Sequence, residues 1–232
     1  SARPDDPMGP ATSAASYLFE ELYRQGVFTS EFFLDDRRFL EGIEGQPDSE
    51  RRAQFLAANA RAQRMAEQRL RSNARDVVAL FVLAITNGMQ ADYTALIEKH
   101  HLESLKFTRK AETFARELLA QKPDSADAYL ALGISNYIIG SLPAYKRFVL
   151  WIGGIHGDRQ IGMSQLEIAA QSGHFLKPFA KILLALAALR EKQREKARQL
   201  FEELSADFPD NPLFARELAL LKRGMPGANS AP

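Results

Sequence analysis

The sequence predicts an all-α fold, a right-handed solenoid of about three helical repeats. Residues 178–211 have the pattern of one 34-residue helix–turn–helix unit that ends at Pro209. Twelve residues separate the small Ala197 from this proline, and the same interval separates Ala111 from Pro123. Because such units bury their apolar faces only against neighbouring units, a constant interval between equivalent positions indicates a solenoid.

The composition excludes several classes of protein. Thirty basic and 29 acidic residues leave a formal net charge of +1, so no global field attracts nucleic acid. The chain has no cysteine, which excludes disulfides and thiolate metal sites. Its most apolar stretch, residues 137–155, is interrupted by Pro143 and two basic residues and is too broken for a membrane span. We therefore expect no nucleic-acid partner, no transmembrane segment and a monomeric protein.

The N-terminal segment suggests export. The chain begins with Ser1, and residues 1–13 are rich in proline, alanine, aspartate and serine. We expect this segment to be disordered, as the mature end left by a removed signal peptide would be. A periplasmic or otherwise exported location is therefore predicted, with the cytoplasm as the alternative.

Residues 14–49 are predicted to form a helical cap on a single domain that spans residues 14–222. Residues 16–25 and 30–42 each have the pattern of a short helix, and a long helix is expected over 50–72. The outermost unit of a solenoid has to shield the apolar face of the next unit. We therefore interpret the cap as an incomplete first repeat, whereas residues 223–232 are predicted to be a flexible tail.

Residues 126–140, ADAYLALGISNYIIG, match the pattern A-W-x-x-L-G-x-x-x-Y-x-x-G of tetratricopeptide repeat (TPR) proteins. The chain therefore resembles this family, and over about residues 50–222 it is similar to bacterial exported TPR proteins of unassigned function. Gly133 is expected where a neighbouring helix crosses closely. Gly140 is expected to end its helix in a left-handed conformation. The matching residues are Ala128, Tyr129, Leu132, Gly133, Tyr137 and Gly140.

Two repeats are longer than the pattern requires. Residues 91–122 are expected to form one long helix after a short connection, because their apolar residues keep helical spacing. The next repeat contains an insertion at residues 141–157, which ends before Asp158. The Asp158 carboxylate is expected to cap the following helix by accepting a first-turn amide.

The insertion contains the apolar residues that no repeat core accounts for. Residues 144–152 are predicted to form a short helix that includes Tyr145, with Phe148 and Trp151 on one face. We expect these two aromatic side chains to be buried against the inner helices, while Lys146 and its neighbour Arg147 face water. An ordinary alternative is a small helix on the flank of the array that leaves the groove free for a ligand.

The resemblance implies a concave groove lined by the first helix of each repeat. The repeat positions that face such a groove are almost all apolar here, and none supplies the lysine, arginine and asparagine pattern of a carboxylate clamp. Since an open apolar groove promotes aggregation, either the chain itself or a partner should cover it. The candidate groove residues are Phe81, Ile85, Leu130, Ile134, Tyr137, Ile182 and Leu186.

Polar candidate sites are few. A stripe of four arginines, Arg61, Arg64, Arg71 and Arg75, is expected on one side of the long helix, where it could hold an acidic partner or simply form a hydrated surface. His100 and the adjacent histidine point about 100° apart on a helix and cannot share one metal ion. We expect no metal site, no cofactor and no catalytic residue.

The sequence therefore predicts a non-catalytic interaction module that binds a protein or peptide partner. A competing hypothesis is a binder or carrier of an apolar small molecule or lipid in the concave groove, and another is an accessory domain of a larger envelope assembly. A continuous cavity lined by Phe81, Ile134 and Leu186 would favour the carrier. A filled groove with an exposed aromatic or arginine patch elsewhere would favour a protein partner.

Overall fold

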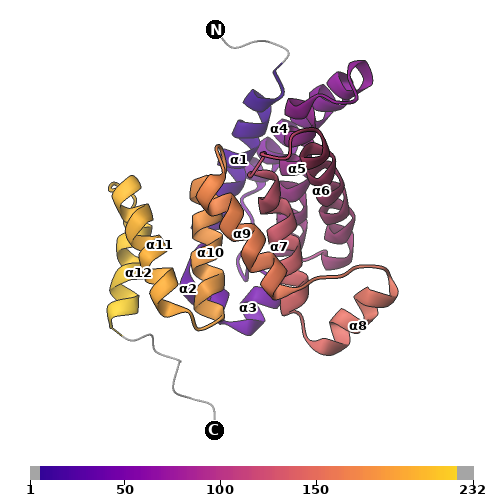
Figure 1. Ribbon diagram of the computed structural model, residues 1–232. Coiled ribbons are helices and arrows are strands. Elements are labelled where there is room, and N and C mark those ends of the chain that lie inside the picture. The colour runs from indigo at the N-terminus through magenta and orange to yellow at the C-terminus, as the bar shows by residue number, and fades with distance from the viewer. Residues whose placement is uncertain (1–5, 224–232) are drawn as a thin grey trace.

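The computed structural model describes residues 6–223, and all regular secondary structure in this range is helical (Figure 1). The all-α class is therefore confirmed. None of the described helices is both long enough and apolar enough to cross a membrane. The helices are α1 (Met8–Arg24), α2 (Ser30–Leu34), α3 (Asp36–Glu41), α4 (Ser49–Ser72), α5 (Val77–Asp92), the π-helix η1 (Tyr93–Ile97), α6 (His101–Gln121), α7 (Ala128–Ser141), α8 (Ala144–Ile152), α9 (Arg159–Ser172), α10 (Lys177–Arg190), α11 (Arg194–Asp207) and α12 (Pro212–Lys222).

The helices pack as a sequence of pairs. Extensive contacts join α1 with α4, α5 with α6, α7 with α9 and α10 with α11, and contacts between α4 and α5, α6 and α7, and α9 and α10 link each pair to the next. Helix α12 packs on α11 at the end of the array. This is a repeat-like arrangement in which α1 and α4 form a full pair. The incomplete first repeat expected from the sequence is thus a complete pair whose connection is long enough to contain α2 and α3.

The N-terminal segment is more regular than expected. Helix α1 begins at Met8, so residues 8–13 are helical rather than disordered, while residues 1–5 lie outside the described range. Ala11 is buried in one core cluster with Ala62 and Ala66 of α4, and this packing holds the first turns of α1 in place. Pro10 is compatible with a helix here because the first-turn amides have no intrahelical acceptor. The predicted tail lies outside the described residues except Arg223.

The single helix expected over residues 30–42 is broken into two. Asp35 lies between α2 and α3 with an extended backbone. Its carboxylate accepts hydrogen bonds from the backbone amides of Arg37 and Arg38, so it caps α3. The break turns the chain sharply and lets these two short helices follow a curved path across the array.

The long helix expected over residues 91–122 starts later than predicted. Helix α5 continues into η1, and Lys99 then adopts a positive φ of 60° before α6 begins. The left-handed residue ends the regular backbone. The connection between α5 and α6 is therefore longer and less regular than the sequence indicated.

Two glycines allow α9 to approach α7 closely. A Cβ on Gly133 would lie 3.0 Å from the Leu166 backbone nitrogen, which confirms the predicted close crossing. Gly140 is not a left-handed terminus as predicted, because it lies within α7. A Cβ there would lie 2.6 Å from the backbone nitrogen of Arg159, so the close approach of the chain explains this glycine. Asp158 caps α9 as expected, accepting hydrogen bonds from the first-turn amides.

Candidate ligand-binding cavity

The connection between α1 and α4 covers the face of α10 that was predicted to line the groove. The ring centroid of Phe179 lies 4.7 Å from that of Phe19 on α1 and 5.7 Å from that of Phe28, just before α2. Aromatic pairs at these separations add to the free energy gained by burying their area. The N-terminal part of the chain thus occupies space that was assigned to the insertion or to a partner.

Arg190 fixes the short helices α2 and α3 on α10. Its guanidinium lies 4.1 Å from the ring centroid of Phe39, donates a hydrogen bond to the Phe33 carbonyl, and lies 2.6 Å from the Asp36 carboxylate. Cation–π and charge-assisted contacts of one guanidinium reinforce each other because they share a single rotamer. These contacts hold α2 and α3 in place on α10.

The same connection also reaches the last helix. The buried Glu217 of α12 accepts a hydrogen bond from the Ser30 backbone amide at 3.2 Å. This bond supplies an acceptor for one of the free amides at the start of α2. The N-terminal connection is therefore held by α10 and α12, far along the chain.

The predicted groove residues do not line one common groove in the structure. Leu130, Tyr137 and Leu186 are buried in the main core, and Ile85 and Ile182 are partly buried against the core clusters. The Tyr137 hydroxyl lies 3.3 Å from the Ala187 carbonyl oxygen, to which it donates, and 3.3 Å from the Glu191 carboxylate. Burial raises the pKa of Tyr137 above its ordinary value. These side chains therefore belong to the packed core, and the Tyr137 hydroxyl joins α7 to the end of α10.

Phe81 and Ile134 have different surroundings. Phe81 is buried, with its ring centroid 5.6 Å from that of Phe175 in the loop before α10. Ile134 is partly buried and lines a cavity. Of the three residues whose common cavity would have favoured a carrier, the structure brings only Ile134 to the cavity, and the continuous groove expected from the sequence is replaced by a different hollow.

This hollow, the central cavity, has a volume of about 430 Å³ and lies between α2–α3 on one side and α8 on the other. Its wall also includes η1, the first turns of α6 and residues of α7 and α10. The volume is within the range of about 300–1,000 Å³ typical of small-molecule sites. Apolar side chains dominate the wall, among them Phe32, Phe39, Leu105, Ile134, Val149 and Leu183.

Asp92, the last residue of α5, places a carboxylate on this apolar wall. Within residues 6–223 the carboxylate has neither a hydrogen bond nor an ion pair. Burial is the sole cause that raises the pKa of Asp92, to about 7. The chain enters the π-helix η1 at this point, and such helices are frequent at functional sites.

Two basic side chains are the other charged groups that line the cavity. Burial lowers the pKa of His101, and the nearby Lys146 lowers it further. His101 opens α6, whereas Lys146 lies on α8 with an exposed side chain. The cavity thus combines an apolar wall, one half-buried carboxylate without a partner among the described residues, and a basic edge.

Helix α8 has the predicted bounds, but its aromatic residues are not buried as predicted. Figure 1 shows it beside the main stack of helices, and none of its residues is buried. Phe148 and Trp151 are 61% and 60% exposed. The prediction was wrong because Phe19 of α1 and Phe28 of the following connection pack on the inner helix α10 instead. Tyr145, which was predicted to lie on this helix of the insertion, lines the central cavity together with Val149.

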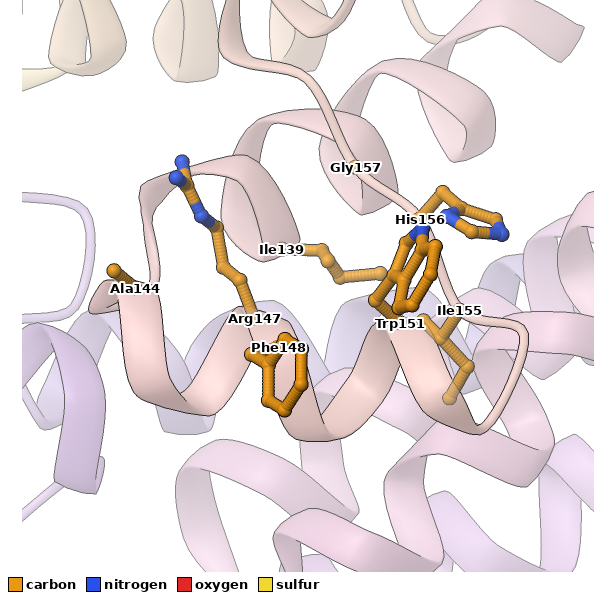
Figure 2. Close-up of a pocket in the computed structure, with 8 residues that line it drawn as sticks. All are labelled: Ile139, Ala144, Arg147, Phe148, Trp151, Ile155, His156 and Gly157. Carbon is orange, nitrogen blue, oxygen red and sulfur yellow. The ribbon is translucent and has the colours of Figure 1, made fainter.

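Helix α8, Ile139 of α7 and residues 155–157 line a second, more open hollow, the outer recess (Figure 2). The rings of Phe148 and Trp151 lie nearly parallel there with centroids 6.3 Å apart, and His156 stands edge-on to the indole. Lys146 and Arg147 are exposed as predicted, and Arg147 also donates a hydrogen bond to the Gly140 carbonyl at 3.1 Å. Arg109 of α6 donates to the Gly153 carbonyl at 2.6 Å, so both ends of α8 are tethered.

The arginine stripe is exposed but only partly helical. Arg61, Arg64 and Arg71 lie on α4, whereas Arg75 follows the end of that helix in a turn. The four side chains form no ion pair with the described residues. Arg75 lies beyond Ser72, the last residue of α4, so the four arginines do not share one helical face as predicted. The stripe remains a hydrated surface with no contact that assigns it a role.

No group of three or more potential metal ligands is found within residues 6–223. Comparisons of the chain with protein-family models, with curated proteins and with solved structures gave no match. The central cavity, with its largely apolar wall, is the candidate site for a small ligand.

Proposed function

We propose that the protein binds an apolar small molecule or lipid chain in the central cavity and does no chemistry on it. The observation that carries this proposal is the cavity itself, about 430 Å³ of space bounded by apolar side chains from eight helical elements. Filling such a space removes apolar surface from water at about 25 cal/mol per Å². A ligand of modest size thereby gains enough free energy for micromolar binding.

The position of α8 supports the proposal. Tyr145, Lys146, Val149 and Leu150 line the cavity from a helix that has no buried residue of its own. Their apolar surface is only partly covered in the protein without ligand, so a ligand chain that packs against them adds burial on both partners. The role of α8 in this proposal is to complete the wall of the site.

The test compares two matched alanine-to-tryptophan variants by titration with the neutral fluorescent probe N-phenyl-1-naphthylamine. Ala95 lines the central cavity and Ala144 lines the outer recess. Ala95→Trp fills the cavity and is expected to weaken binding of the probe at least about tenfold, whereas Ala144→Trp leaves it nearly unchanged. Leu183→Phe serves as a second cavity-filling variant if Ala95→Trp does not fold. Equal binding to all variants would contradict the proposal, as would no binding to the wild type.

A second candidate function, the interaction module expected from the repeats, is favoured by the exposed aromatic pair of the outer recess. Phe148 and Trp151 offer adjacent rings to solvent, and aromatic residues of this kind are enriched among the residues that dominate binding at protein interfaces. A partner recovered with the wild type should be lost from the double variant with both residues changed to serine. Tyr23→Ser, which removes an exposed aromatic from α1, is the matched control.

A further inference from the structure

The carboxylate of Asp92 is half-buried on the apolar wall of the central cavity, and this position bears on which ligand the cavity selects. An ionised carboxylate in apolar surroundings loses much of its hydration, and a partner of opposite charge or a donated hydrogen bond has to compensate. No described side chain supplies that partner, although the surface of Asp92 faces the cavity. The cavity that Asp92 lines has room for a group that would pair with its carboxylate.

We propose that the central cavity selects amphiphiles with a primary amine, whose ammonium group pairs with the Asp92 carboxylate while the alkyl chain lies on the apolar wall. This inference rests on the proposed function. An ammonium group neutralises the charge and donates three hydrogen bonds, and a charge-assisted hydrogen bond is about twice as strong as a neutral one. The chain contributes through burial along residues such as Leu105 and Val149.

Other ligand classes fit the cavity less well. A fatty acid would place a second carboxylate beside Asp92, and like charges in an apolar site repel strongly. An alcohol donates one hydrogen bond but leaves the negative charge unneutralised. A metal ion needs several ligands, whereas the other titratable residues on the wall are His101 and Lys146.

Lys146 does not take the place of the ligand amine. Its side chain is exposed on α8, and burial alone accounts for the raised pKa of Asp92. An ammonium group close to Asp92 would instead lower that pKa. Asp92 therefore acts on a ligand from the end of α5, whereas Lys146 acts on it from the exposed helix α8.

The experiment measures displacement of N-phenyl-1-naphthylamine at pH 8 by three ligands of equal chain length, dodecylamine, dodecanol and dodecanoate, each below its micelle concentration. In the wild type, dodecylamine is expected to bind roughly 10–100-fold more tightly than dodecanol, and dodecanoate most weakly. Asp92→Asn should abolish the difference between amine and alcohol while dodecanol binding is kept. Asp124→Asn, at an exposed turn residue, should behave as the wild type.

The outcomes separate this inference from the proposed function. If all three ligands displace the probe equally well, or dodecanoate is the tightest, the preference for amines is wrong while the apolar site stands. If the probe does not bind to the wild type, the site itself is wrong. Should Asp92→Asn fail to fold, dodecyltrimethylammonium replaces it in the test, because this cation has no N–H to donate and should bind the wild type more weakly than dodecylamine. Equal affinity of the two cations would overturn the proposed pairing.

Discussion

The helix pairs α10–α11 and α7–α9 are similar in their helices but differ in the connection between them. Between α10 and α11 the connection is three residues long, and Ala185 and Ala197 are fully buried where the helices meet. Between α7 and α9 the connection includes α8, whose apolar residues are largely exposed. The paired helices therefore stabilise the array, whereas the long connections are free to form binding surfaces.

The largest expected effect is a direct measure of this contrast. Phe201 of α11 is fully buried and Phe148 of α8 is 61% exposed. Phe201→Ala should lower the free energy of unfolding by about 3–5 kcal/mol because it leaves a cavity in a packed core. Phe148→Ala should change it by less than about 0.5 kcal/mol. Chemical denaturation measures both values, and similar losses would show that α8 is part of the stabilising core.

Overpacking tests whether the helix crossings of both pairs are equally tight. Ala197→Leu in the last pair and Gly133→Leu in the middle pair should each cost about 1–3 kcal/mol or more, because the neighbouring helix leaves no space for the added atoms. Ala206→Leu, at an exposed position of α11, is the control and should be nearly neutral. A melting temperature unchanged by either core variant would show that the helix register is wrong.

Asp92 should reduce the stability of the empty protein at neutral and higher pH. A carboxyl group whose pKa is higher in the folded than in the unfolded chain destabilises the fold as the pH rises between the two values, here from about 3.9 to about 7. Asp92→Asn should therefore stabilise the protein by about 1–2 kcal/mol at pH 8 and hardly at pH 4, with the effect limited because the Asp92 side chain is only half-buried.

Denaturation of both proteins at the two pH values gives the comparison. His101 has a lowered pKa, which destabilises the fold toward acidic pH, but this contribution is common to both proteins and cancels. Lys146 is likewise present in both. A destabilising effect of Asp92→Asn at pH 8 would mean that the carboxylate has a partner within the protein.

The smallest expected effect concerns the arginine stripe. Changing Arg61, Arg64, Arg71 and Arg75 together to glutamine should alter the free energy of unfolding by less than about 0.5 kcal/mol and leave binding of the apolar probe intact. Arg69→Gln is a useful contrast, because Arg69 pairs at 2.7 Å with the aspartate that caps α5. Loss of probe binding in the fourfold variant would connect this surface to the cavity.

Local features of the chain could be predicted well from the sequence. Helical periodicity, the bounds of α8 and the cap by Asp158 all depend on residues a few positions apart. The close crossing at Gly133 followed from a small residue at a repeat position. The resemblance to tetratricopeptide proteins and the export of the chain stay predictions.

The central cavity could not be predicted because it is built by connections that are distant in the sequence. The burial of Phe148 and Trp151 was expected on the assumption that the inner helices had no other cover, yet Phe19 and Phe28 provide it. A signal for Asp92 did exist, since it lies seven residues after Ile85 and continues the same helical face. A lone acidic residue on an apolar face is a sequence feature that points to such a site.

A crystal structure of the wild type with dodecylamine is the most direct test of the central claim that these connections form a ligand site. We expect the alkyl chain between α8 and α2–α3, with the ammonium nitrogen about 2.7–2.9 Å from a carboxylate oxygen of Asp92. A ligand bound in the outer recess against Phe148 and Trp151, with only water in the central cavity, would contradict the proposed site.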